Sequence, residues 1–110
     1  MKRGSKEARF QSHLILELKK RFPGCIVTKL DSGHIQGIPD LLLLWGTHWA
    51  ALECKRSKAA HHQPNQAYYV NRMNEMSFAR FIFPENKEEV LYELEQAFRS
   101  GGKSRDSFPK

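Results

Sequence analysis

Hydrophobic positions in the first half of the chain predict one helix followed by three strands. Apolar residues recur at helical spacing from Lys6 to Phe22, where Pro23-Gly24 ends the segment. The apolar face of this predicted helix consists of Leu14, Ile15, Leu18 and Phe22. The segment from Cys25 to Leu30 favours a strand. Two apolar runs, Leu41 to Trp45 and Trp49 to Leu52, are short and bounded by turn residues, as buried strands are.

The second half predicts a helix, a strand and a helix. Pro64 stands at the favoured first position of a helix, and Ala79 to Phe83 is a strand that Pro84 stops. Lys87 to Arg99 has a helical apolar face, and its acids are expected mostly in water. Those acids are Glu88, Glu89, Glu93 and Glu95. The predicted element order is therefore α-β-β-β-α-β-α, in one domain spanning residues 1–99, with a disordered basic tail at 100–110.

A hairpin register brings two acids together. If Gly46-Thr47 is a two-residue turn, Trp45 pairs with His48, and the pairing continues back to place Asp40 opposite Glu53. The two carboxylates then lie on one face of the sheet, about 5 Å apart at Cβ.

Lys55 belongs to the same face as Glu53, because residues two apart on a strand point the same way, and Cys54 points to the other side. Two carboxylates beside an ammonium group are poor core material but suit a hard divalent cation. The alternative is that Asp40 is a turn residue and that Glu53 and Lys55 lie on a solvated face. Their common position at the ends of strongly apolar strands favours the site.

A helical wheel separates two glutamates of the first helix. Glu7 and Gln11 lie within the apolar arc, whereas Glu17 lies roughly 110° from its centre. Glu7 is therefore expected to point inward and Glu17 to face water. The alternative for Glu7 is a first-turn acid that complements the helix dipole.

These motifs together resemble the PD-(D/E)XK nuclease superfamily, and within it the VRR-NUC branch of virus-type replication and repair nucleases, which includes relatives similar to Holliday junction resolvases. The resemblance covers roughly residues 5–95. The motifs that carry it are Glu7 with Gln11, Gly37-Ile38-Pro39-Asp40-Leu41, Glu53-Cys54-Lys55 and Pro64-Asn65-Gln66. The chain departs from the pattern in having Cys54 where an aliphatic residue is usual, and in carrying His61-His62 after the hairpin; a small apolar Cys fits the inward position.

The resemblance implies an α/β fold with a restriction-endonuclease-like core, a mixed sheet flanked by helices, and a Mg²⁺-dependent active site in which Mn²⁺ is also possible. Asp40, Glu53 and Glu7 would bind the metal, together with the backbone carbonyl of Cys54. Lys55 would orient the attacking water and stabilise negative charge as a cation. Gln66 would brace the site or contact the DNA backbone.

The amino-acid composition also predicts a polyanionic binding partner. The 18 Lys and Arg residues outnumber the 12 Asp and Glu residues, which gives a net charge of +6. Lys55-Arg56-Ser57-Lys58 leaves the proposed site with three positive charges in four residues, and the polar loop from Asp31 to Gly37 either touches substrate or is a plain connector. The candidate nucleic-acid contacts are Lys6, Arg9, His34, Arg56, Lys58 and Arg72.

Cysteine usage and hydropathy indicate a cytoplasmic protein. Cys25 and Cys54 lack the spacing of a zinc site or a disulfide framework, and are expected to be reduced thiols. His61 and His62 lack a third zinc ligand at a suitable distance. The N-terminus has no apolar signal region, and Leu41 to Trp45 is the longest apolar run, so no membrane association is expected.

The sequence thus predicts a metal-dependent DNA endonuclease that selects branched DNA, since a chain this small has no separate domain for reading base sequence. A nicking or end-processing nuclease of phage or mobile-element DNA is one alternative. A nucleic-acid-binding module without activity is another, although the intact acids and Lys55 disfavour it.

A homodimer is also expected, because resolving a four-way junction requires two cuts at symmetric positions. The apolar residues considered for a self-complementary surface are Tyr68, Tyr69, Met73, Met76 and Phe78, which could instead pack inside the monomer.

Overall fold

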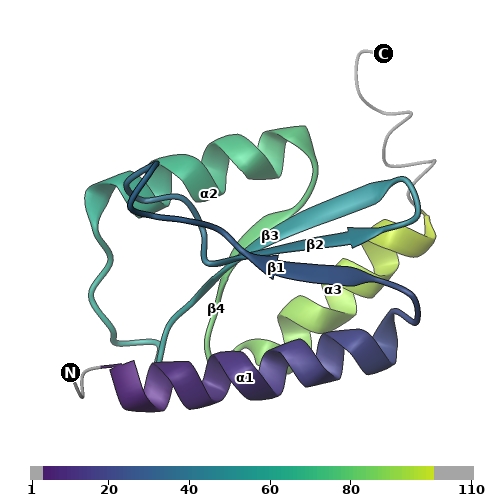
Figure 1. Cartoon of the computed structure of the whole chain (residues 1–110), viewed down its shortest axis with the longest axis horizontal. Coiled ribbons are helices and arrows are strands. Elements are labelled where there is room, and N and C mark those ends of the chain that lie inside the picture. The colour runs from purple at the N-terminus through teal and green to yellow at the C-terminus, as the bar shows by residue number, and fades with distance from the viewer. Residues whose placement is uncertain (1–3, 101–110) are drawn as a thin grey trace.

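The structure, a computed structural model, describes residues 4–100 and has the element order that the sequence predicts (Figure 1). Its helices and strands are α1 (Gly4–Arg21), β1 (Ile26–Lys29), β2 (Leu41–Trp45), β3 (His48–Cys54), α2 (Pro64–Met76), β4 (Ala79–Ile82) and α3 (Lys87–Arg99). The predicted fold class, a mixed sheet flanked by helices, is confirmed.

The four strands form one sheet in the order β1-β2-β3-β4. The first three strands are antiparallel, and α2 is the crossover that brings β4 parallel to β3. The predicted hairpin register is confirmed, because Trp45 pairs with His48 and Leu41 pairs with Leu52. Gly46 supplies the positive φ, 64°, that the two-residue turn requires.

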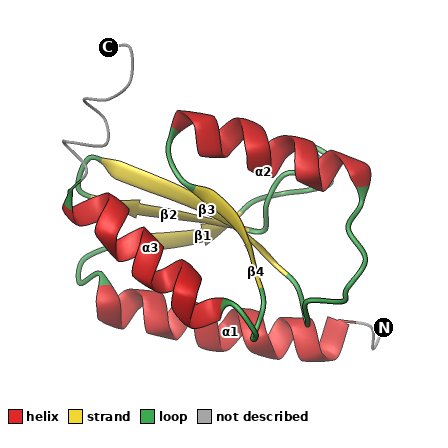
Figure 2. Ribbon diagram, turned by 180° about the vertical axis from the view of Figure 1, so that it is seen from behind, coloured by secondary structure: helices red, strands yellow, loops and turns green. Residues whose placement is uncertain are grey.

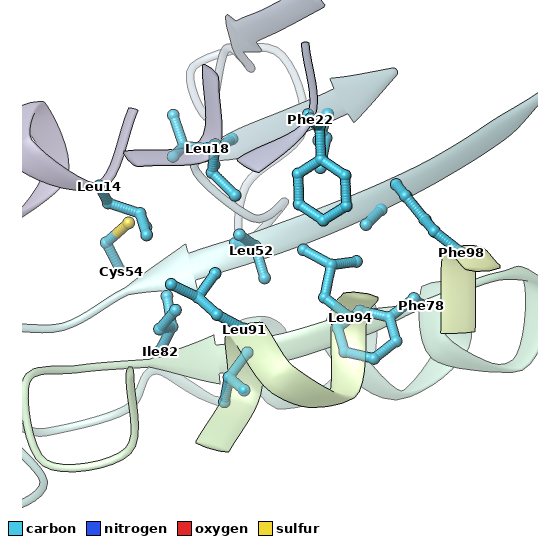
Figure 3. Close-up of a cluster of buried hydrophobic side chains, with 14 residues drawn as sticks. Leu14, Leu18, Phe22, Leu52, Cys54, Phe78, Ile82, Leu91, Leu94 and Phe98 are labelled. Carbon is cyan, nitrogen blue, oxygen red and sulfur yellow. The ribbon is translucent and has the colours of Figure 1, made fainter. Parts of the chain in front are cut away.

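Two helices cover one face of the sheet and one helix covers the other (Figure 2). The main core lies between the sheet and the pair α1 and α3, where leucine and phenylalanine side chains from both helices meet the inward residues of β3 and β4 (Figure 3). The residues at its centre are Leu14, Leu18, Phe22, Leu52, Cys54, Ile82, Leu91 and Leu94, each at most 1% exposed. Burial of these apolar side chains is the dominant favourable contribution to folding.

The opposite face of the sheet is only half covered. α2 packs Val70 against Ala51 of β3 and Ala79 of β4. Ile26 and Leu44 are cross-strand partners in β1 and β2, and they remain 60% and 38% exposed. Leu44 also pairs with Trp49 of β3, which contacts the α2 cluster, so these residues share the α2 face. The helix therefore leaves apolar sheet surface uncovered over β1 and β2.

The structure corrects the predicted position of Glu17. This carboxylate does not simply face water, because it accepts hydrogen bonds from Lys87 of α3 at 2.7 Å and from Arg21 at 2.9 Å. A wheel drawn for α1 alone places Glu17 off the main apolar arc, but α3 packs beside α1 and supplies the opposite charge. The acid is therefore part of the contact between the two helices.

Part of the predicted self-complementary surface is also corrected. Phe78 is only 5% exposed and belongs to the main core, and Met73 packs against the small cluster under α2. Tyr68 and Met76 remain 56% and 50% exposed. The predicted tail lies outside the described residues, except for Ser100, which follows α3. No helix among residues 4–100 is long and apolar enough to cross a membrane.

Candidate active site

A pocket of about 400 Å³ opens where β2 begins and β3 ends, and it contains the predicted site. Its charged and polar lining comes from α1, from the loop before β2, from the end of β3, and from the loop and first turn of α2. These side chains are Glu7, Ser32, Asp40, Glu53, Lys55, Arg56, His61, Gln63 and Gln66. Three segments of the chain, at Glu7, at residues 32–40 and at residues 53–66, therefore meet at this one place.

Asp40 is fixed against the strand that carries Glu53. Its Oδ2 accepts a hydrogen bond from the backbone N–H of Cys54 at 2.9 Å, one residue beyond Glu53. The β2–β3 pairing ends at Leu41 and Leu52, so Asp40 and Glu53 are the next residues on either side of it. The prediction that the turn would bring these two acids together is supported by this geometry.

Glu53 is a buried carboxylate with an unsatisfied oxygen. The residue is 2% exposed, and its Oε1 has no hydrogen-bond partner among the described residues. Burial raises the pKa of Glu53 to about 8, and the negative charges of Asp40 and Glu7 add to the rise, whereas Lys55 opposes it. A buried, unsatisfied carboxylate beside another acid is destabilising without a compensating cation.

Gln66 links Glu53 to Lys55. Its side-chain Nε2 donates to Oε2 of Glu53 at 2.8 Å, and its Oε1 accepts from Nζ of Lys55 at 2.7 Å. The same Oε1 accepts from the backbone N–H of Gln63, which holds the glutamine at the start of α2. Lys55 lies 3.6 Å from Oε2 of Glu53, so its closest partner is the amide and not an acid. The prediction that Gln66 braces the site is supported by these contacts.

Cys54 points away from the pocket, as the alternation along β3 predicts. It is fully buried in the main core, and burial raises the pKa of its thiol. Both cysteines are unpaired. The Cys54 side chain is thus part of the core, and its backbone N–H contacts Asp40.

Gly37 allows the loop before β2 to approach α2 closely. Its φ is +95°, and a Cβ at this position would lie 2.7 Å from the backbone carbon of Asn65. The side chain of Asn65 also donates to the carbonyl of Gln36 at 3.4 Å. Loop and helix therefore form one rim of the pocket, which explains the glycine before Ile38 and Pro39.

The oxygen ligands present suit a hard cation. Asp40, Glu53 and the backbone of Cys54 offer the carboxylate and carbonyl oxygens that Mg²⁺ prefers. Among residues 4–100, no three His, Cys, Asp or Glu side chains lie close enough to form a ligand group by themselves. Glu7 lines the same pocket but is not part of a three-acid cluster. The unsatisfied Oε1 of Glu53 is the observation that fits a bound cation.

Only one of the predicted nucleic-acid contacts lies at the pocket. Arg56 lines the pocket. The other five predicted contacts, Lys6, Arg9, His34, Lys58 and Arg72, are exposed and lie outside its lining. Arg72 forms an ion pair with Glu75 at 3.0 Å, one turn along α2. These five residues thus remain predicted surface contacts.

His61 is a pocket residue that the sequence did not place there. Its position depends on the path of the loop between β3 and α2, which no periodic pattern reveals. The preceding Lys55, two residues beyond Glu53 on the same strand face, was the only available signal that this loop begins at the site.

Comparisons with protein-family models, with curated proteins and with solved structures find no match.

Proposed function

We propose that the protein is a divalent-cation-dependent endonuclease that hydrolyses phosphodiester bonds of DNA. The buried carboxylate of Glu53 supports this proposal most strongly, since its Oε1 lacks a partner among the described residues, and it shares an open pocket with Asp40 and Lys55. A purely structural carboxylate at 2% exposure would be expected to have both oxygens satisfied.

Asp40, Glu53 and the carbonyl of Cys54 are the groups that would hold Mg²⁺ or Mn²⁺, and Glu7 would extend the set through water. When bound, such an ion makes water nucleophilic at neutral pH and neutralises charge on phosphoryl oxygens. The protein contributes the fixed positions: Asp40 is held by the Cys54 N–H, and Glu53 is held by Gln66.

Lys55 supplies a positive charge close to where the phosphate would react. The residue is 6% exposed, and its Nζ is held by Gln66 at 2.7 Å and lies near Glu53. An ammonium group has three donors, so after these contacts Nζ can still orient water or a phosphoryl oxygen. Its partial burial strengthens this electrostatic interaction.

DNA is the proposed substrate because the chain as a whole carries an excess of positive charge. Arg56 stands at the pocket, and the chain carries a net charge of +6. Branched DNA, such as a Holliday junction, is the preferred form in this proposal, since the described residues form one small α/β unit that would read backbone shape. This preference rests on the resemblance to VRR-NUC nucleases.

We further propose that two copies act together and that they act inside the cell. The exposed Ile26 and Leu44 on the half-covered sheet face, with Tyr68 and Met76 on α2, provide apolar surface for self-association. Two unpaired cysteines fit a reducing compartment.

Cleavage of a substrate panel tests the proposal. Purified protein is incubated with a labelled four-way junction, a flap, a linear duplex and a single strand, with Mg²⁺, with Mn²⁺ and with EDTA. We expect metal-dependent cleavage, fastest for the junction. Cleavage of linear DNA or of ends alone would favour a nicking or end-processing nuclease, and binding without cleavage under every condition would favour an inactive binding module.

A further inference from the structure

His61 lies in the pocket because its loop is held on both sides. The backbone N–H of Ala60 donates to the carbonyl of Ser57 at 3.1 Å, and that of Lys58 donates to Glu85 at 3.1 Å. His62 stacks on Phe81 of β4, with ring centroids 4.0 Å apart and an interplanar angle of 5°. His61 lies between these anchored residues in the loop, and it lines the pocket.

Apart from His61, the titratable side chains of the pocket already have other roles in the proposed mechanism, since Asp40 and Glu53 would hold the metal ion. Arg56 does not lose its proton in proteins, and the remaining donors of the Lys55 ammonium group would orient the attacking water or a phosphoryl oxygen. The charged or titratable groups that line the pocket or lie next to His61 are Glu7, Asp40, Glu53, Lys55, Arg56 and His62. An imidazole exchanges a proton near pH 7 and is the commonest general acid in enzymes.

We propose that His61 is a further catalytic residue, the general acid of the proposed hydrolysis. Water attacks phosphorus and releases a proton to solvent, the bond from phosphorus to the leaving oxygen breaks, and that oxygen takes the proton of the His61 imidazolium. The neutral imidazole is then protonated again by solvent, which reaches it because the side chain is exposed. This inference rests on the proposed nuclease function and adds to it the source of the leaving-group proton.

A substrate whose leaving group needs no proton tests this role. The cleaved linkage is first mapped in an ordinary oligonucleotide, and the leaving oxygen is then replaced by sulfur. A thiol is far more acidic than an alcohol, so the thiolate leaves without protonation. We expect His61→Gln to slow cleavage of the oxygen linkage by about 10²-fold or more, and to slow the sulfur linkage by less than about fivefold.

The ratio of the two rates within each variant removes the effect of partial unfolding, because unfolding lowers both rates equally. His62→Gln, which loses the stack on Phe81, is the matched control and should leave the ratio at the wild-type value. Equal losses on both linkages in His61→Gln, or no loss on either, would overturn the role of His61. If wild-type protein cleaves neither substrate, the nuclease function itself fails, and the inference fails with it.

Discussion

The side-chain amide of Gln66 donates a hydrogen bond to Oε2 of Glu53 at 2.8 Å, and so connects the first turn of α2 to the end of β3. Because the same amide accepts from Lys55, the relative position of acid and ammonium depends on one side chain. The site is therefore held by contacts between two elements that are separate in the sequence.

Replacing this amide should loosen the site and lower stability. Gln66→Ala leaves Oε2 of Glu53 and Nζ of Lys55 without their partner, which costs about 1–3 kcal/mol for a buried polar group. We expect the free energy of unfolding in urea to fall by this amount and cleavage to slow at least tenfold. Asn71→Ala, at an exposed position of the same helix, is the control. Wild-type stability in Gln66→Ala would contradict the bridging role.

The stability of the metal-free protein should fall as pH rises. The pKa of Glu53 is about 8 in the folded protein, whereas a glutamate in the unfolded chain titrates near about 4.3. Between these values the folded state binds the extra proton, so the free energy of unfolding decreases with increasing pH up to about 8. Glu53→Gln should remove most of this decrease. Urea unfolding in EDTA at pH 5, 6.5 and 8 measures it.

Added Mg²⁺ should restore the stability that the metal-free protein loses as the pH rises toward 8, because an ion that binds only the folded state stabilises it. A melting temperature at pH 8 that does not change with Mg²⁺, Mn²⁺ or EDTA would count against a metal at Glu53. The exposed Glu89 of α3 offers a matched charge control, and Glu89→Gln should respond to pH and metal as the wild type does.

Substitutions of two glutamates of α1 should have different effects, one on the cleavage rate and the other on stability. Glu7 lines the pocket, so Glu7→Gln should slow cleavage with little change in melting temperature. Glu17 pairs with Lys87 and Arg21, so Glu17→Gln should lower stability by about 1 kcal/mol and leave the cleavage rate of folded protein unchanged. Thermal unfolding and initial cleavage rates of both variants decide this. The reverse pattern would mean that the pocket is not where the chemistry occurs.

The part of the fold that could be predicted is the part set by local sequence. Gly46 fixes a two-residue turn, and the turn fixes the register as far as Leu41 and Leu52, which leaves Asp40 and Glu53 at the adjoining ends of the two strands. Helix α3 has the predicted bounds because its apolar face has a clear helical period. Strand β3 likewise continues through Cys54, as the predicted alternation of Glu53, Cys54 and Lys55 requires. The pairing of its last residues with β4, which arrives only after α2, is not visible in local sequence.

Contacts between distant elements account for the remaining errors. The helical pattern of α1 places Glu17 in water because the charge of Lys87 lies 70 residues away in the sequence. Phe78 was considered for an exposed surface, but it enters the core just before β4. His61 could not be placed because its loop is held by Phe81 and Glu85, which follow it in the chain. Nothing in local periodicity carries such information.

The half-covered sheet face should take part in self-association. We expect light scattering after gel filtration at micromolar concentration to give twice the 12.8 kDa chain mass. Leu44→Lys, which places a charge on the exposed apolar surface over β2, should shift the mass toward one chain. Lys29→Glu on β1 is an exposed control for a charge change alone. A mass of one chain for the wild type, with and without junction DNA, would rule out the dimer and favour a nicking enzyme.

Cleavage by acid-to-amide variants tests the central claim most directly. Initial rates on a labelled four-way junction with Mg²⁺ are compared for wild type, Asp40→Asn, Glu53→Gln and the control Glu89→Gln, with DNA binding measured in parallel. The proposed metal site predicts that both pocket variants lose about 10³-fold or more in rate, while they bind DNA as tightly as wild type or more tightly, because each removes a negative charge beside the phosphate. Full activity in Asp40→Asn or Glu53→Gln would contradict the assignment of the active site.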